Sequence, residues 1–191
     1  IIVERGSTLS IENLNIYGLK NSNFRCLDDA GTISLENSRY ILLDNYTFDT
    51  GKLIINNLLQ INKPSDEPLT FAYKTKQQSI INPCGILYIN EGIIFSYEPT
   101  CNTRDLIKLG ASGSKIVLDK ATLHSTSTGM QMTKGVLEVN GACYVASDAT
   151  CIAEGVICGD GISTENDLKI KILASSNLEI TSGCMIMKNL N

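Results

Sequence analysis

The sequence predicts an all-β protein folded as a single-stranded parallel β-helix, a β-solenoid of about eight or nine rungs. A short strand-like phrase recurs about every 20–24 residues, a glycine precedes most copies, and no segment of about 11 or more residues has a helical period. Matching strands without helical crossovers can be parallel neighbours only if the chain coils. We therefore expect each copy to form one rung, stacked about 4.8 Å above the last.

The recurring phrase alternates as a strand with one inward face does: an apolar residue, any residue, a β-branched residue or leucine, then a polar residue. Its seven copies begin at Leu9, Ile33, Leu53, Leu87, Ile116, Leu137 and Leu178. The polar position holds Glu12, Glu36, Asn56, Asn90, Asp119, Asn140 and Thr181. We expect the rung to bend there, because short polar residues tolerate left-handed backbone angles. The preceding glycines are Gly6, Gly31, Gly51, Gly85, Gly113 and Gly135.

The copies are separated by 24, 20, 34, 29, 21 and 41 residues. We interpret 34 and 29 as one turn plus a loop, and 41 as two turns with a degenerate copy near Leu168 or around Cys151. A second apolar phrase follows most copies, at residues 46–50, 69–73, 93–97, 122–126 and 143–147. These extra strands predict that the return half of each rung is also β-structure, which disfavours a leucine-rich repeat. A β-sandwich would not explain why the phrase recurs with its glycine.

The chain is expected to form one domain, residues 1–191, with loop insertions near 62–85 and 97–113. Both insertions contain proline and lengthen rungs that would otherwise be near 22 residues. They follow the same side of the repeat, so we expect them to cluster in space. Loops on a rigid solenoid are the usual place for binding specificity.

The phrases "GSTLSIENLNIYGL", "GTISLEN" and "GKLIINN" resemble the right-handed parallel β-helix of the pectin-lyase-like superfamily. The resemblance is nearer to its non-enzymatic bacterial surface and adhesin-type members than to its enzymes. It implies a right-handed coil and a structural or adhesive role on an extracellular or cell-surface module. It covers nearly the whole chain, but solenoid ladders are shared by unrelated activities.

Composition argues against several other classes of function. The net charge is −4, no lysine or arginine stripe is present and tryptophan is absent, which disfavours nucleic-acid binding. No apolar run is long enough to span a membrane as a helix. The seven cysteines are an odd number without a CxxC pair, and His124 is the single histidine, so a zinc site is not expected. Cys84 and Cys101 flank a strand-like segment and could form a disulfide.

The superfamily's enzymes use paired carboxylates or Ca²⁺ held by aspartates, and this chain matches those patterns only in part. "CGDGIST" at 158–164 has one aspartate where a hydrolase has two, and "KIK" at 169–171 only weakly matches the last motif. Arg25, Asp28 and Asp29 are the best lyase candidates, and Asp160, Glu165 and Asp167 form a second acidic cluster. Each is more readily explained as a turn or an exposed loop. We therefore predict no catalytic, cofactor-binding or metal-binding residue.

Aromatic residues of the second phrase predict either a core ladder or an exterior binding surface. Phe71 and Phe95 are expected in the core, whereas the positions of Tyr73, Tyr97 and Tyr144 stay open. "HSTSTG" at 124–129 could begin a flat threonine surface, but the aligned segments lack the matching threonines.

The sequence therefore favours a non-catalytic structural, adhesive or assembly module, either a fragment of a longer protein or a filament subunit. Its expected partners are another copy end to end, the rest of a longer chain, or a surface glycan or protein. The alternative is a polysaccharide lyase or hydrolase. Three or more carboxylates with an arginine or lysine on one exterior strand face would favour that alternative.

Overall fold

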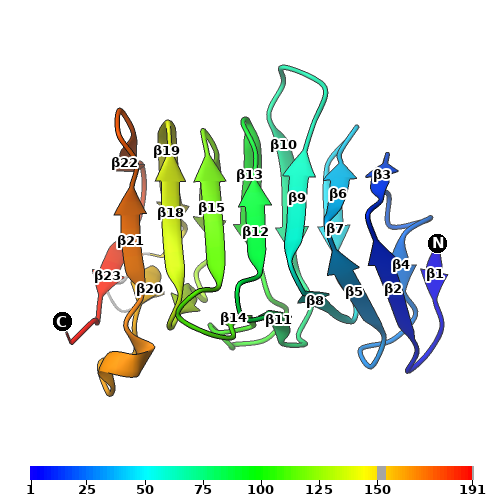
Figure 1. The fold of residues 1–191 in the computed structure, drawn as a ribbon, viewed down its shortest axis with the longest axis horizontal. Coiled ribbons are helices and arrows are strands. Elements are labelled where there is room, and N and C mark those ends of the chain that lie inside the picture. The colour runs from blue at the N-terminus through cyan, green and yellow to red at the C-terminus, as the bar shows by residue number, and fades with distance from the viewer. Residues whose placement is uncertain (150–153, 191) are drawn as a thin grey trace.

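The computed structural model describes residues 1–149 and 154–190, and it shows short parallel strands stacked in columns along one axis (Figure 1). The largest sheet has seven strands: β3 (Asn15–Tyr17), β6 (Ser38–Ile41), β9 (Leu58–Asn62), β12 (Ile86–Ile89), β15 (Lys115–Asp119), β18 (Val136–Asn140) and β21 (Lys169–Ile172). A second sheet has six: β7 (Tyr46–Phe48), β10 (Leu69–Tyr73), β13 (Ile93–Tyr97), β16 (Thr122–Ser125), β19 (Ala142–Ser147) and β22 (Asn177–Ile180).

The third side of the coil is divided between a five-stranded and a three-stranded sheet. The first contains β2 (Thr8–Glu12), β5 (Thr32–Glu36), β8 (Lys52–Ile55), β11 (Ser79–Ile81) and β14 (Ile107–Leu109). The second contains β17 (Met130–Met132), β20 (Val156–Cys158) and β23 (Met185–Met187). The remaining elements are the pair β1 (Ile2–Val3) and β4 (Arg25–Cys26) and a short 3-10 helix, Thr164–Asn166.

The chain visits the three sides in a fixed order, for example β5, β6 and β7, and then β8, β9 and β10. The protein is therefore a parallel β-solenoid, as the sequence predicts, with about seven turns in the described residues rather than eight or nine rungs.

The recurring phrase does not stay on one side of the coil, which explains the overestimate. Leu9, Ile33 and Leu53 are neighbours in the sheet of β2, β5 and β8. The copies at Leu87, Ile116 and Leu137 instead stack in the seven-stranded sheet, and the copy at Leu178 pairs with Cys143 in the six-stranded sheet. The 34- and 41-residue spacings therefore each combine one turn with a step to the next side, whereas the 29-residue spacing is one turn within the seven-stranded sheet. The 41-residue spacing contains the expected degenerate copy near Leu168, because Ile170 of β21 pairs in register with Leu137. The stretch around Cys151 lies outside the described residues.

The second phrase is the one that remains on one side. Its five copies form β7, β10, β13, β16 and β19, which are consecutive strands of the six-stranded sheet. Their inward side chains make aromatic ladders: the Phe71 and Phe95 rings stack at 5.6 Å and 8°, and the Tyr73 and Tyr97 rings at 5.9 Å and 8°. All four are buried, so Phe71 and Phe95 lie in the core as expected and two of the open tyrosines join them. Tyr144 is 37% exposed.

The bends lie one residue later than the sequence predicts. Left-handed backbone angles occur at Asn13, Asn37 and Lys120, each directly after the polar position of a copy. The polar side chains instead hydrogen-bond between turns: Asn56 Nδ2 donates to Ser34 Oγ at 2.9 Å and Asn82 Nδ2 donates to Asn56 Oδ1 at 2.8 Å. These amides therefore link successive turns at the corner through side-chain hydrogen bonds.

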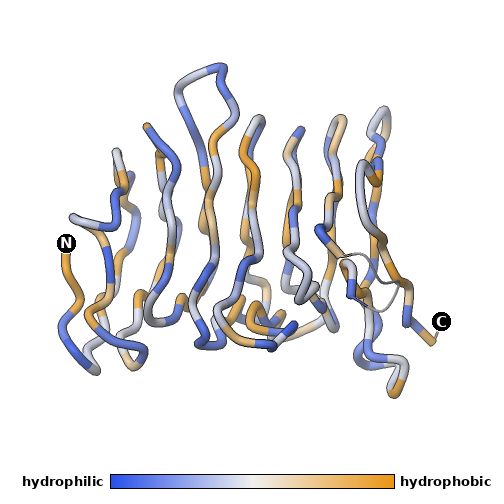
Figure 2. Tube along the Cα trace, turned by 180° about the vertical axis from the view of Figure 1, so that it is seen from behind, coloured by the Kyte–Doolittle hydropathy of each residue, from blue (hydrophilic) through white to orange (hydrophobic). Residues whose placement is uncertain are grey.

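The two segments expected as insertions are largely part of the coil. Residues 62–85 include β10 and β11, and only residues 63–68 project, as the hydrophilic loop beyond the sheets in Figures 1 and 2. Residues 97–113 include β14. The expected clustering holds for the connections after β10 and β13, where Lys74 pairs with Glu98 at 3.0 Å and Gln78 Nε2 donates to the Asp105 carbonyl at 3.0 Å.

Tyr40 has a fully buried hydroxyl without a hydrogen-bond partner. Because an unpaired buried hydroxyl costs about 1–3 kcal/mol, we expect Tyr40→Phe to raise the free energy of unfolding by about 1 kcal/mol. Tyr73→Phe is the matched control, since its hydroxyl bonds to Ser79 Oγ at 2.8 Å, and this change should lower stability by about 1 kcal/mol. Urea unfolding measures both, and a loss of stability in Tyr40→Phe would contradict the prediction.

Candidate functional site

The interior of the solenoid offers no room for a ligand among the described residues. The cavity between the stacked core strands has a volume of about 10 Å³ and is lined by side chains such as Leu59, Phe71 and Phe95. That volume holds at most about one water molecule. Any site in this part of the chain therefore lies on the outside of the coil or at its ends.

The lyase candidates near the N-terminus serve the turns. Asp28 Oδ1 accepts hydrogen bonds from the backbone N–H groups of Gly31 at 2.9 Å and Gly6 at 3.2 Å. Asp29 pairs with Lys76 of a later turn at 2.8 Å. Arg25 lies on the short strand β4. The carboxylates therefore act as turn and corner contacts, and they do not converge on a common point with a third acidic residue.

The "GDG" segment is also a turn. Asp160 Oδ1 accepts from the backbone N–H groups of Ile162 and Ser163 at 2.8 and 3.1 Å, and Oδ2 accepts from Asn166 Nδ2. The Ile162 N–H is the main reason that the pKa of Asp160 lies below its ordinary value. Asp167 accepts from the Leu190 N–H at 2.8 Å. Within residues 1–149 and 154–190, no group of three or more His, Cys, Asp or Glu side chains is placed to hold a metal ion.

Cys84 and Cys101, which could have formed a disulfide, are both free cysteines. Cys84 is exposed at the corner before β12, whereas Cys101 lies in the connection between β13 and β14. Cys26, Cys143 and Cys158 are buried, and burial raises the pKa of the Cys158 thiol to about 12. These three buried thiols pack as small apolar side chains. Cys151 lies outside the described residues.

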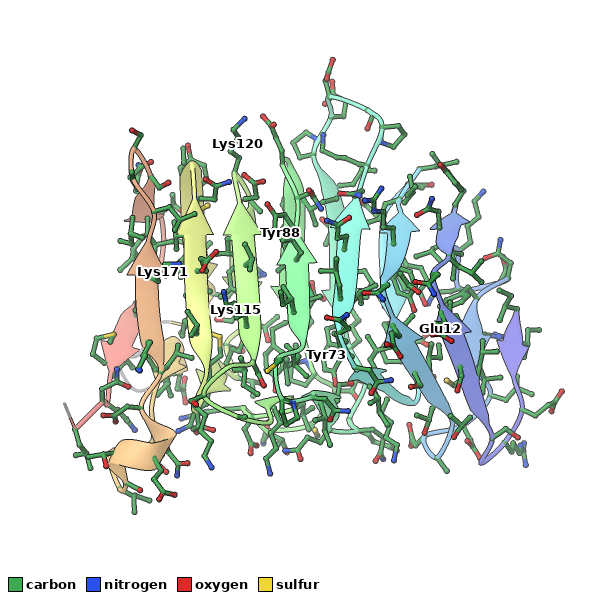
Figure 3. The ribbon with its side chains drawn as sticks, in the orientation of Figure 1. Glu12, Tyr73, Tyr88, Lys115, Lys120 and Lys171 are labelled. Atoms are coloured by element: carbon green, nitrogen blue, oxygen red, sulfur yellow. The ribbon has the colours of Figure 1, made fainter. Side chains whose placement is uncertain are left out.

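The seven-stranded sheet carries charged side chains along its outer face (Figure 3). Glu138 binds two lysines from neighbouring turns, Lys115 at 3.3 Å and Lys171 at 3.0 Å. The hydrogen bond from Lys171 is the main reason that the pKa of Glu138 is lowered. At the end of the same strands, the Tyr88 hydroxyl donates to Asp119 Oδ2 at 2.6 Å. Both carboxylates are held by cross-turn partners.

The six-stranded sheet carries a denser polar cluster that the sequence did not single out. The His124 network consists of Lys74, Ser96, Glu98, His124 and Asp148, from four consecutive turns. His124 Nδ1 lies 2.8 Å from Ser96 Oγ, and His124 Nε2 lies 3.1 Å from Asp148 Oδ1. Ser96 Oγ donates to Glu98 Oε1 at 2.6 Å, and Glu98 Oε2 pairs with Lys74 Nζ at 3.0 Å.

The electrostatics of the His124 network favour an ionised Glu98. Burial opposes the charge, but the hydrogen bonds from Ser96 and Lys74 outweigh it, so the pKa of Glu98 lies below its ordinary value. The order serine, histidine, aspartate also occurs in hydrolases. Here, however, Ser96 is only 2% exposed and its hydroxyl proton points to Glu98, so the oxygen is not presented to a substrate.

Register explains both why this network forms and why the sequence did not reveal it. Ala72, Ser96, His124 and Ala146 stack in one outward column, because β10, β13, β16 and β19 pair residue for residue. Ser96 and His124 are 28 residues apart, which matches no fixed repeat length. The available signal was the polar Ser, His and Asp residues on or directly after the second phrase. To align them with one another, however, one would have to know the length of every connection between the strands.

The two polar clusters described above each contain two carboxylates. The His124 network holds two carboxylates, Glu98 and Asp148, and Lys74 is already paired. On the seven-stranded sheet, Glu138 and Asp119 are engaged as described above.

The C-terminal end of the coil exposes side chains that would be core residues elsewhere. Ile172, Ile180 and Met187 are 52%, 49% and 55% exposed. They stack in register on Val139, Val145 and Cys158, which are all 0% exposed. The N-terminal end is better filled, since the inward Val3 and Ile11 of its outermost strands are each only 4% exposed.

The fold defines the protein as a parallel β-solenoid. Comparisons of the chain with protein-family models, with curated proteins and with solved structures find no match. The described part of the chain contains no helix of the length and apolar character needed to cross a membrane.

Proposed function

We propose that the protein is a non-catalytic assembly module that extends by stacking a further β-solenoid turn on its C-terminal end. The observation that carries the proposal is the exposure of Ile172, Ile180 and Met187 at positions where the preceding turn is fully buried. Burying each of these side chains contributes about 1.5–3 kcal/mol. The outer edges of β21, β22 and β23 offer backbone groups for parallel pairing.

The outer faces support the same proposal. Their charged groups bind one another between turns, as in the contacts of Glu138 with Lys115 and Lys171, and so stiffen the coil. The resemblance to bacterial surface members of the pectin-lyase-like superfamily supports an extracellular or cell-surface location. In that setting the module would act as a structural or adhesive spacer, with a surface glycan or protein as a further partner.

Polysaccharide cleavage is the second candidate function, and the accessible part of the His124 network favours it. The His124 and Asp148 side chains are 24% and 61% exposed, so an acid–base pair reaches the solvent. The test is to incubate the purified protein with an acidic polysaccharide. If the wild type cleaves it and His124→Gln does not, polysaccharide cleavage replaces the structural proposal.

The stacking proposal predicts end-to-end self-association of the purified chain through its C-terminal end. Ile172→Lys/Ile180→Lys should abolish it, because two buried charges without partners would oppose stacking. Sedimentation velocity over about two decades of concentration measures the association, and electron microscopy shows whether the particles are lengthened rods. Leu43→Lys is the matched control, since Leu43 is 59% exposed away from the C-terminal end. A wild-type chain that stays monomeric throughout, or a double variant that associates like the control, would overturn the proposal.

A further inference from the structure

The two ends of the solenoid differ in how completely their inward side chains are covered. At the C-terminal end, Ile172 and Ile180 are exposed, and residues of the last turn line a hollow of about 940 Å³. At the N-terminal end, the inward Val3 and Ile11 are already buried. A second copy stacked head to tail would therefore meet the open C-terminal end with a surface whose inward residues are covered without it.

The last strands also leave backbone groups unpaired at the C-terminal end. In a parallel ladder, alternate residues direct both of their backbone groups to the same neighbouring strand. Lys169 of β21 and Asn177 of β22 donate their N–H groups to the preceding turn, each at 3.0 Å. Ile170 and Leu178, the next residues on these strands, therefore direct their N–H and C=O groups toward the open end. Both edges can accept a further strand.

The order of the strands makes this end complementary to a copy of itself. β21 runs toward the corner at residues 173–176, at the top of the view in Figure 1, and β22 leaves it. A two-fold axis through that corner sets β21 antiparallel to β22 of a second copy, and β22 antiparallel to its β21.

The residues of the two edge strands match in this arrangement. β21 and β22 each have four residues, and apolar and polar residues alternate in both. With Ile170 opposite Leu178 of the second copy, apolar side chains meet inside the coil and unpaired backbone groups meet between the strands. The third edge strand, β23, faces its own counterpart, and its sequence Met-Ile-Met carries no charge that would repel it.

Charge supports the same register. It sets Lys169 opposite Glu179 of the second copy, once on each side of the axis. Both side chains are exposed, and neither forms an ion pair or a side-chain hydrogen bond in the part of the chain that the structure describes. Lys171 keeps its bond to Glu138 and lies opposite the uncharged Asn177. A head-to-tail contact offers no equivalent, because β3, the N-terminal edge of the seven-stranded sheet, has no carboxylate.

We propose that the C-terminal end binds the C-terminal end of a second copy, so that two chains form a closed two-fold dimer joined tail to tail. The inference rests on the proposed function, since it names the partner of the stacking surface. Each chain uses its open end once, and association therefore stops at two chains. The dimer is a rod with the two N-terminal ends at its tips.

Charge reversal tests the register of the dimer. Sedimentation velocity over about two decades of concentration should show wild-type monomer and dimer and no larger species. Lys169→Glu and Glu179→Lys should each weaken the dimer about tenfold, because two attractive contacts become repulsive. Lys169→Glu/Glu179→Lys should return the dissociation constant to within about threefold of wild type, since opposite charges again face each other. Glu67→Lys is the matched control, because Glu67 is exposed in the loop at 63–68, and it should leave the dimer unchanged.

Electron microscopy of the wild-type chain, with gold bound to a tag at its N-terminus, reports the orientation. Both labels should lie at the tips of the rod. A label at the centre of the rod would overturn the proposal, as would species larger than dimers or a double variant that associates no more tightly than either single variant.

These outcomes separate the tail-to-tail dimer from the proposed function. If the chain associates in another orientation, and Ile172→Lys/Ile180→Lys still abolishes that association, the stacking proposal stands and only the two-fold dimer is wrong. A wild-type chain that stays monomeric throughout overturns the stacking proposal itself.

Discussion

Phe95→Ala is expected to lower the free energy of unfolding by about 3–5 kcal/mol, the range for deleting a buried aromatic ring. Phe95 is 2% exposed and stacks on Phe71 with ring centroids 5.6 Å apart. Leu123 of the next turn pairs with it in register. The backbone ladders fix the distance between turns, so the core cannot collapse into the space left by the ring. Urea unfolding followed by circular dichroism measures the change.

The control for this prediction is an aromatic residue on the outer face of the same sheet. Tyr144 is 37% exposed, and Tyr144→Ala should change stability by no more than about 0.5 kcal/mol. Phe95→Leu, which keeps most of the volume, should cost less than about 1.5 kcal/mol. A loss below about 1 kcal/mol in Phe95→Ala would mean that the aromatic ladder does not support the coil.

Alternating apolar residues predicted the fold because a strand with one buried face needs this pattern wherever it lies in the coil. Because the pattern fits a strand on any side of the coil, it could not give the number of turns. Leu53 and Leu87 satisfy the same rule, yet they belong to different sides, in β8 and β12. A phrase defined only by polarity cannot distinguish three sides that all have a polar exterior and an apolar interior. The aromatic residues of the second phrase are more specific, because stacked rings favour one another over aliphatic neighbours.

The candidate site could not be predicted in the same way, since it depends on register. Ser96 and His124 lie in one column because the connections between β13 and β16 are of a length that brings the two residues into register. One residue more or fewer would turn His124 inward. By contrast, local signals gave the right interpretation of "GDG": Asp160 folds its own loop through bonds to residues two, three and six positions away.

Gly51→Ala is expected to cost about 3 kcal/mol, and it tests why glycine so often precedes the recurring phrase. Gly51 has φ +83°, where an L-residue costs about 1–2 kcal/mol. A Cβ there would also lie 2.7 Å from the Gly31 carbonyl oxygen and 2.6 Å from Cys26 Sγ, both on the preceding turn. The Gly31 carbonyl accepts a hydrogen bond from the Lys52 N–H at 3.0 Å, so it cannot withdraw without disturbing the parallel pairing of β5 with β8. The urea midpoint of Gly51→Ala should therefore fall further than the unfavourable backbone angle alone would predict.

Gly6 separates the two causes, because its φ is +65° and nothing lies within 4 Å of an added Cβ. Gly6→Ala should therefore cost only the conformational part, about 1 kcal/mol. If the two substitutions cost the same, close approach between turns is not what requires glycine, and backbone angle alone explains the pattern. If Gly51→Ala costs more by about 2 kcal/mol, the recurrent glycine marks the points where one turn of the solenoid contacts the next through its backbone.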